Sequence, residues 1–362
     1  MAEYEPLPVT LPFPTPRQEV FDLLNGIWDR NWLTNNGPVL REFEATFTRT
    51  FGLEHVKVVG NGTVALQLAY QALCLEGEVI TTPISYIATT SSLVWERCKP
   101  VFVDVLPSTL CLDPEAIEAA ITDRTTAIVA THCYGLPCDV EAIQTIADKH
   151  GLKVVYDAAH AVGSTFKGRS LLSFGDYSTT SFHATKLLHA VEGGAIISAN
   201  ATLDRKIFLN RNFGHNGPED FSGVGINGKM SEFHAAVGLV NMRHAGAILA
   251  RRKQAHAWYD AALQGAAVEK LAAPEGTDWN CSYYPVLFDS EAALLRTFEV
   301  LAAHGITARR YFYPSLDTLD FVDPAVLPVA HDVTRRVACL PLMYQLTEAD
   351  VARVAGIVCQ HA

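Results

Sequence analysis

The sequence predicts an α/β fold in which helices flank a mainly parallel central sheet, with a smaller α+β domain after it. Between about residues 56 and 157, short runs rich in β-branched residues alternate with helical segments. Strands and helices that alternate in this way form parallel sheets. Beyond about residue 250 the helices become more charged and the alternation stops. We therefore expect a large domain at residues 1–250 and a small C-terminal domain at residues 251–362.

The chain begins with a proline-rich arm and two expected helices. Apolar side chains recur at helical spacing in residues 17–33, namely at Val20, Leu23, Leu24, Ile27 and Trp28. A turn-like TNNGP segment follows, and a second helix is expected from about Val39 to Phe51.

The alternating region predicts strands at 56–59, 78–82, 100–105, 126–132, 153–157, 176–182 and 194–198. The helices expected among them occupy 63–75, 86–96, 114–121 and 139–150. Asp113 and Pro114 fit the start of the third of these helices, and Gly151 fits the end of the fourth. Ligands collect at the carboxyl ends of parallel strands, so the segments GNGT, TPISY, HCYG and DAAH are the places to seek a site.

The C-terminal part predicts helices at 251–263, 290–305 and 347–361, and strands at 281–288, 306–313 and 338–342. Thr347 and Asp350 have the spacing of a capping box at the start of the last helix.

Composition excludes several classes of partner. The formal net charge is −11, and Lys and Arg do not gather into runs, so we expect no nucleic acid and no anionic membrane surface as partner. The acidic, proline-rich N-terminus does not resemble a signal peptide, and no apolar run is long enough to span a bilayer. The eight cysteines are scattered, which favours the reducing cytosol. His132, Cys133 and Cys138 lack a second pair of ligands, so no metal site is expected.

The segment VVGNGTVALQLA has the order strand, glycine turn and helix. Backbone N–H groups at the start of a helix bind phosphate, and the hydroxyl of Thr63 adds a donor beside Gly62 and Val64. The glycine spacing also imitates a dinucleotide fingerprint, but the next strand ends without the acidic residue that would hold a ribose. A phosphate site is therefore favoured over a nicotinamide site. On this motif alone, a tight turn without a ligand is an equal alternative.

Three further side chains lie at the same expected edge of the sheet. Asp157 ends an apolar strand, Tyr86 follows another strand, and Lys186 is the lone lysine between two expected strands. Taken singly, each has an ordinary structural explanation: a turn aspartate, a core tyrosine and a lysine that reaches solvent. Together with the phosphate site they match pyridoxal 5′-phosphate, which needs an amine for a Schiff base, a carboxylate for the pyridinium nitrogen and an aromatic face.

Several longer segments carry a resemblance to a known family: NGTVALQLA, GEVITTPISYIATT, VFVDV, YDAAHAVG, SFHATK, EGGAI, GINGKMSEFHAAVGL and RRYFYPSL. On these segments, and over essentially its whole length, the chain resembles the DegT/StrS family of pyridoxal-phosphate-dependent nucleotide-sugar aminotransferases. The resemblance implies a fold type I transferase in which residues 1–250 form the cofactor-binding domain.

The resemblance also implies roles for individual residues. Lys186 corresponds to the catalytic lysine that forms a Schiff base with pyridoxal phosphate, and Asp157 to the partner of the ring nitrogen. The remaining cofactor-binding positions implied are Gly62, Thr63, Val64, Tyr86, His160, Ser181 and Asn227. Asn227 resembles an asparagine that reaches the phosphate from the neighbouring subunit, which implies a homodimer with two shared active sites. Candidate substrate contacts are Trp32, Thr34, Asn35, His183, Tyr313 and Lys229, the last standing where arginine is common.

The implied reaction is transamination. L-glutamate would convert the cofactor to pyridoxamine 5′-phosphate, which would then aminate a nucleotide-linked keto-sugar. SFHATK, WLTNNGP and RRYFYP are more similar to enzymes that aminate C4 of dTDP-4-keto-6-deoxy-D-glucose than to the branch that aminates C3. The product would be a 4-amino-4,6-dideoxy sugar of the kind used in O-antigen or lipopolysaccharide.

Alternatives from other classes remain at this point. Another nucleotide keto-sugar, or amination at C3, would need the same chemistry. A sugar dehydratase of the same fold is expected to carry histidine at the position of Lys186. A non-enzymatic regulator is expected to have lost Lys186 or Asp157, and the chain has both.

Overall fold

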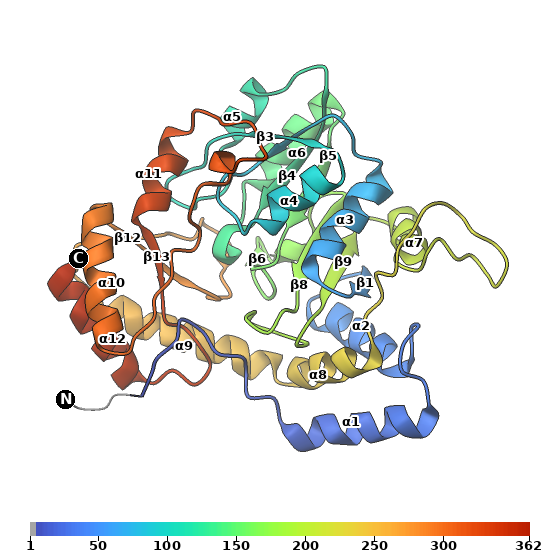
Figure 1. The fold of residues 1–362 in the computed structure, drawn as a ribbon, viewed down its shortest axis with the longest axis horizontal. Coiled ribbons are helices and arrows are strands. Elements are labelled where there is room, and N and C mark those ends of the chain that lie inside the picture. The colour runs from blue at the N-terminus through green and yellow to red at the C-terminus, as the bar shows by residue number, and fades with distance from the viewer. Residues whose placement is uncertain (1–4) are drawn as a thin grey trace.

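The computed structural model describes residues 5–362, and within them a seven-stranded sheet forms the centre of the molecule (Figure 1). The order of the strands across this sheet is β1-β9-β8-β5-β4-β2-β3. Their bounds are β1 (His55–Val59), β2 (Glu78–Thr81), β3 (Lys99–Phe102), β4 (Thr125–Thr131), β5 (Lys153–Asp157), β8 (Tyr177–Ser181) and β9 (Gly194–Ser198). β9 is antiparallel to both neighbours, and every other pairing within the sheet is parallel. The prediction of a mainly parallel sheet is confirmed.

Helices cover both faces of this sheet, because alternate residues of each strand point to opposite sides. On one face, apolar side chains of β2, β4 and β5 pack against α3 (Gly62–Leu73), α4 (Ala88–Trp95) and α7 (Ala201–Asn210). On the other face lie α2 (Pro38–Thr50), α5 (Pro114–Ala119), α6 (Val140–His150) and α8 (Glu232–Arg243). α1 (Arg17–Arg30) packs on the outside of α8. Asp113 caps α5 and Gly151 ends α6, as predicted.

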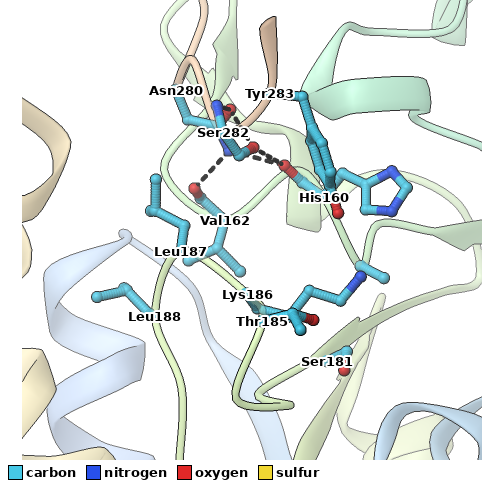
Figure 2. A pocket seen from close by; sticks show the side chains of 11 residues that line it. His160, Val162, Ser181, Thr185, Lys186, Leu187, Leu188, Asn280, Ser282 and Tyr283 are labelled. Carbon is cyan, nitrogen blue, oxygen red and sulfur yellow. Dashed lines mark hydrogen bonds between the residues drawn. The ribbon is translucent and has the colours of Figure 1, made fainter. Parts of the chain in front are cut away.

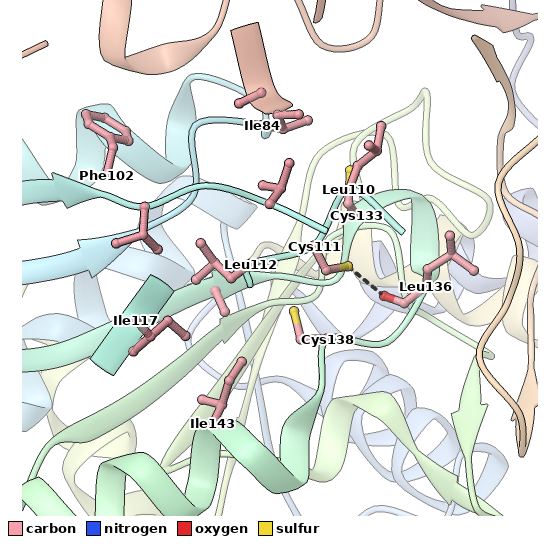
Figure 3. Close-up of a cluster of buried hydrophobic side chains, with 14 of the residues drawn as sticks. Ile84, Phe102, Leu110, Cys111, Leu112, Ile117, Cys133, Leu136, Cys138 and Ile143 are labelled. Carbon is pink, nitrogen blue, oxygen red and sulfur yellow. Dashed lines mark hydrogen bonds between the residues drawn. The ribbon is translucent and has the colours of Figure 1, made fainter. Parts of the chain in front are cut away.

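The segment that contains His132, Cys133 and Cys138 lies in the apolar cluster over α5 and α6 (Figure 3). Cys133 and Cys138 are buried there, and the Sγ of Cys111 lies 3.6 Å from the carbonyl oxygen of Leu136. His132 stacks on Tyr156, and burial lowers its pKa to about 3. Across residues 5–362, no group of three or more His, Cys, Asp or Glu side chains is placed to hold a metal ion.

A smaller α+β unit follows. Its antiparallel sheet has the order β10 (Val268–Lys270), β12 (Tyr284–Phe288), β13 (Val337–Leu340). Four helices accompany this sheet: α9 (Ala245–Ala262), α10 (Glu291–Ala303), α11 (Pro328–Arg336) and α12 (Glu348–His361). The predicted capping box of Thr347 and Asp350 is present at the start of α12. The expected domain boundary at residue 250 falls inside α9, which begins directly after α8.

Short elements connect the two parts. β11 (Thr277–Asp278), which precedes β12, pairs with β6 (Thr165–Phe166), and β6 pairs with β7 (Arg169–Ser170). Three 3₁₀ turns complete the described elements: η1 (Cys133–Gly135), η2 (Leu171–Ser173) and η3 (Leu316–Thr318). No helix within residues 5–362 is long and apolar enough to cross a bilayer.

The strand predicted at 306–313 is wrong. Ile306 pairs with Leu7 of the N-terminal arm, and Arg309 pairs with Cys339, but each pairing is isolated. The chain turns at Tyr311, and the ring of Phe312 stacks on His160 instead of continuing the alternation of a strand. This segment is therefore a loop that reaches back to the large sheet.

One buried carboxylate holds the start of α2. Gly37, which precedes the helix, has no side chain to cap it, and Pro38 occupies the first turn. Glu232 of α8 replaces the cap: its carboxylate accepts hydrogen bonds from the N–H groups of Val39 at 3.0 Å and Leu40 at 2.8 Å. The N–H of Glu232 donates to the carbonyl oxygen of Leu33 at 3.0 Å, on the other side of the TNNGP loop. A negative charge at a helix N-terminus is favourable.

We predict that Glu232→Ala lowers the free energy of unfolding by about 3 kcal/mol, because it leaves two buried N–H donors without an acceptor. Urea unfolding followed by circular dichroism measures this loss. The matched control is Glu42→Ala, at an exposed position of the capped helix, which should change stability by less than about 0.5 kcal/mol. An equal midpoint for the two variants would contradict the capping role.

Candidate active site

The predicted polar segments meet at one edge of the sheet because β1, β2, β4, β5 and β8 run in the same direction. Their carboxyl ends carry the glycine turn at Gly60–Gly62, the segment 82–87, Asp157 and Ser181. Lys186 lies on the connection from β8 to β9, above the same edge. This is the place where parallel sheets bind ligands.

The glycine turn approaches the end of β8 very closely. A Cβ atom added to Gly62 would lie 3.0 Å from the Cβ of Ser181 and 3.3 Å from its Oγ. At the start of β9, a Cβ atom on Gly194 would lie 2.6 Å from the carbonyl carbon and oxygen of Asn61. The approach at Gly194 requires glycine, and a Cβ on Gly62 would press on Ser181. The Ser181 hydroxyl is therefore held beside the N-terminus of α3.

The N-terminus of α3 has two free donors. Asn61 caps the helix, since its Oδ1 accepts from the N–H of Val64 at 2.9 Å. The N–H of Val64 is thus satisfied within the protein, whereas those of Gly62 and Thr63 have no acceptor among residues 5–362. With the positive end of the helix dipole and the Ser181 hydroxyl, they form a cradle suited to a phosphate.

Asp157 is a buried carboxylate at the end of β5, with 6% of its surface exposed. Its Oδ2 accepts from the hydroxyl of Thr89 at 2.6 Å, and its Oδ1 accepts from the N–H of Ala159 at 3.1 Å. Hydrogen bonds of this kind to an ionised acceptor are the strong ones, so the burial of this charge is compensated.

Lys186 extends into a small pocket that it shares with His160 and Ser181 (Figure 2). Its Nζ has no hydrogen-bond or ion-pair partner within the part of the chain that the structure describes. Burial lowers the pKa of Lys186 to about 8, although the Asp157 carboxylate opposes the shift. A lysine with a lowered pKa has more neutral amine near neutral pH and is a better nucleophile.

His160 lies in the turn after β5 and is buried. Burial and the Lys186 cation hold the pKa of His160 well below its ordinary value, so the ring is neutral. The imidazole stacks on Phe312, with 5.3 Å between ring centroids, and its buried Nδ1 has no hydrogen-bond partner among the described residues. Buried polar atoms are normally paired, which marks this nitrogen as available to a ligand.

Sequence reasoning missed the segment that holds this turn in place. Asn280 donates through Nδ2 to the carbonyl oxygens of His160 at 2.7 Å and Val162 at 2.8 Å, and Ser282 Oγ donates to the same His160 oxygen at 2.9 Å. Tyr283 lines the same pocket, with its ring 4.9 Å from that of His160 between centroids (Figure 2). The only sequence signal is the polar and aromatic run NCSYY at the start of the strand predicted at 281–288, which does not by itself indicate a site.

A second pocket brings two of the predicted substrate contacts together. Asn35 and Lys229 line it with Arg205, Phe208, Asn212, Phe213, His215, Asn216 and Gly217. Lys229 donates to Asn212 Oδ1 at 2.9 Å, and its Nζ lies 4.7 Å from the centroid of the Phe213 ring. Two cationic side chains beside two phenylalanine rings suit a phosphorylated ligand with a flat ring.

The other predicted site residues lie outside both pockets. Tyr86 is 59% exposed just before α4, and Asn227 is exposed next to Lys229. Trp32 and Thr34 are on the exposed loop before α2, and Trp32 lies under the guanidinium of Arg41. His183 hydrogen bonds through Nδ1 with Thr185 Oγ1 at 2.8 Å, and Tyr313 stacks with the guanidinium of Arg310 at 3.5 Å.

Comparison with known proteins identifies relatives over the whole chain. Residues 14–359 match the model of the DegT/DnrJ/EryC1/StrS aminotransferase family. A dTDP-4-amino-4,6-dideoxy-D-glucose transaminase of Escherichia coli is 38% identical over 97% of this chain and 98% of its own length. A protein of the same name from Shigella dysenteriae is 41% identical over 95% of each chain. The crystal structure of DesI in the presence of its TDP-sugar product superposes with a TM-score of 0.94 at 36% identity, over 99% of this chain and 93% of that one.

We predict that the amine of Lys186 reacts with aldehydes with a midpoint near pH 8, because its neutral form predominates above that pH. An ordinary lysine reacts with a midpoint near about 10.4. Reductive methylation with formaldehyde and cyanoborohydride across a pH series, followed by peptide mass spectrometry, measures the midpoint of Lys186 and those of exposed lysines. Asp157→Asn removes the opposing charge and should move the Lys186 midpoint to lower pH. A Lys186 midpoint equal to that of exposed lysines would refute the effect of burial.

Proposed function

The chain belongs to the DegT/DnrJ/EryC1/StrS aminotransferase family, and from this premise we propose that it transfers the amino group of L-glutamate to a nucleotide-linked keto-sugar. The substrate we propose is dTDP-4-keto-6-deoxy-D-glucose, aminated at C4. The products are 2-oxoglutarate and dTDP-4-amino-4,6-dideoxy-D-glucose. The observation that carries the proposal is Lys186, a partly buried lysine without a partner, beside the buried Asp157 carboxylate and the phosphate cradle.

The residues present fit pyridoxal 5′-phosphate. The cradle of Gly62, Thr63 and Ser181 would hold the phosphate, and Asp157 would hold the pyridinium nitrogen. The unpaired Nδ1 of the buried His160 is a partner for a polar group on the ring. Tyr86, with its exposed ring, would stack on the cofactor, and the Lys186 amine would bind it covalently. When bound, the cofactor supplies an electron sink that stabilises a carbanion at the reacting carbon.

The chain's own groups move the proton. Lys186 Nζ takes the proton from the α-carbon of glutamate and later gives a proton to C4 of the sugar, which becomes the carbon that bears the amine. A pKa near 8 suits both steps, because the amine exchanges a proton readily in either direction at neutral pH. Thr89 and Ala159 fix the orientation of the Asp157 carboxylate through their hydrogen bonds, and this carboxylate would pair with the protonated ring nitrogen. Asn280 and Ser282 hold the turn that carries His160.

Two comparisons support a nucleotide sugar aminated at C4, and a third supports a TDP-linked sugar. The E. coli and S. dysenteriae relatives are named as dTDP-4-amino-4,6-dideoxy-D-glucose transaminases, and DesI was crystallised with a TDP-sugar. The pocket of Arg205, Lys229 and Phe213 offers cations for a diphosphate and a ring for a base. Relatives named as acting on UDP and GDP sugars match less closely, at 33% and 34% identity.

Asn227 and Lys229 serve the partner's active site in the proposed homodimer. Asn227 and Lys229 belong to the projecting loop that follows α7 (Figure 1), where Val224 is 82% exposed. Val224 and Ile226 line an apolar groove with Trp95 and with Thr63 at the start of α3. An exposed apolar surface of this kind is typical of an interface, and here it adjoins the phosphate cradle. A second copy on this groove would place one loop against the other subunit's cradle.

We predict that the purified protein, after incubation with pyridoxal phosphate, absorbs visible light and that L-glutamate bleaches the band. Lys186→Ala should retain less than about a thousandth of the rate of amine transfer, since it removes both the covalent anchor and the base. Chromatography of the nucleotide sugars measures transfer to dTDP-4-keto-6-deoxy-D-glucose.

A panel of keto-sugar nucleotides tests the substrate separately from the chemistry. UDP- and GDP-linked 4-keto sugars and a dTDP-linked 3-keto sugar serve as competitors, and Lys206→Ala, outside the site, is the control variant. Faster turnover of a 3-keto sugar would overturn amination at C4. A protein that binds no pyridoxal phosphate would overturn the whole proposal.

Mixing experiments test the shared active site. Lys186→Ala subunits and subunits with both Asn227→Ala and Lys229→Ala should each be nearly inactive. Random exchange makes half of the dimers hybrids with one complete site, so the mixture should recover about a quarter of wild-type activity. No recovery, with hybrids confirmed by mass spectrometry, would show that the loop serves its own subunit.

A further inference from the structure

Three buried hydroxyl groups form a hydrogen-bonded chain that ends on Asp157. The hydroxyl of Thr131, at the end of β4, lies 3.1 Å from the hydroxyl of Ser85, which follows β2. Ser85 Oγ lies 2.7 Å from Thr89 Oγ1, and Thr89 Oγ1 lies 2.6 Å from Asp157 Oδ2. All four side chains are at least nine-tenths buried. The chain thus links three elements of the large domain, namely β4, the start of α4 and β5.

The Asp157 carboxylate, at the end of this series of hydrogen bonds, determines which group donates in each of them. An ionised carboxylate only accepts hydrogen bonds, so Thr89 must donate its single hydroxyl proton to Asp157. Thr89 Oγ1 is then the acceptor for Ser85, and Ser85 Oγ is the acceptor for Thr131. The Ser85 and Thr89 hydroxyls each donate and accept, and the Thr131 hydroxyl donates. Successive hydrogen bonds aligned in this way strengthen one another. Such an alignment stabilises negative charge at the Asp157 end.

We propose that Thr89 is a positioning residue that orients the Asp157 carboxylate toward the cofactor's ring nitrogen, with Ser85 and Thr131 as its support. The inference rests on the proposed function, because it concerns the partner of that nitrogen. Thr89 does not line the Lys186 pocket, so it acts only through Asp157. The N–H of Ala159 holds the other carboxylate oxygen, and the two donors together fix the plane of the carboxylate.

The neighbouring Thr90 provides a matched control. Thr90 lies on the same helix, is completely buried, and its hydroxyl has no hydrogen-bond partner among the described residues. Thr89→Val and Thr90→Val make the same chemical change at adjacent positions, but only the first removes a donor from Asp157. Thr89→Ser keeps the donor and removes a methyl group. Ser85→Ala leaves the Thr89 bond in place and removes its support.

The experiment measures two quantities for each variant of the full-length protein. The first is the dissociation constant of pyridoxal phosphate, from titration of its visible band. The second is the rate at which saturating glutamate bleaches that band in the cofactor-loaded protein. Thr89→Val should weaken cofactor binding and slow the limiting bleaching rate by at least about tenfold each, with the KM for glutamate unchanged. Thr89→Ser and Thr90→Val should stay within about twofold of wild type, and Ser85→Ala should lose about threefold.

Each outcome decides the proposal. If Thr89→Val matches Thr90→Val while the wild type binds the cofactor and is bleached, the positioning role is overturned and the proposed function stands. If Thr89→Ser is as impaired as Thr89→Val, the methyl group and not the donor matters, which also overturns it. Thermal unfolding of the cofactor-free variants identifies a folding defect, and Ser85→Ala then decides by its own threefold loss. A wild type that does not bind pyridoxal phosphate would overturn both inferences.

Discussion

The Asp157 carboxylate lies at the buried end of β5, and a charge in that position requires hydrogen-bond donors from separate parts of the chain. Thr89 supplies one from α4, and the backbone at Ala159 supplies the other. Lys186 is subject to the same burial without such partners, so its amine loses part of its preference for the charged form. An acid whose burial is compensated by hydrogen bonds and a nearby base without such partners are thereby suited to different tasks.

Much of this arrangement is predictable from the sequence, because parallel strands bring their carboxyl ends together. The alternating pattern predicted β1 to β5, the strand ends pointed to Asp157 and the turn at Gly62, and the family resemblance pointed to Ser181. Those predictions depend on local signals: β-branched runs, a glycine turn and a single lysine. The family was recognisable for the same reason, since its motifs lie at these strand ends.

The remainder depends on contacts between distant segments. Residues 306–313 alternate like a strand, but their aromatic side chains are used to cover His160, so the pattern misleads. α8 went unpredicted because it is buried on most sides and has no amphipathic stripe. Asn280 lies more than a hundred residues from the His160 carbonyl that it holds, and Thr89 lies 68 residues from Asp157. No spacing in the sequence indicates such pairs. The contacts of Asn280 with His160 and of Thr89 with Asp157 are therefore visible only in the structure.

The anchoring of the TNNGP loop by Glu232 bears on how a protein of this kind changes its specificity. The Glu232 carboxylate accepts hydrogen bonds from Val39 and Leu40 after the loop, and the Glu232 backbone N–H donates to Leu33 before the loop. Residues 34–36 therefore span two fixed points. Asn35 and Asn36 have left-handed backbone with φ of 61° and 59°, which favours Asn or Gly there, so the exposed Thr34 is the position whose side chain varies most easily without shifting either helix. Substitutions at Thr34, a proposed substrate contact, therefore change the surface of the loop at little cost to folding. Glu232 thus fixes both ends of the loop and leaves its exposed surface open to substitution.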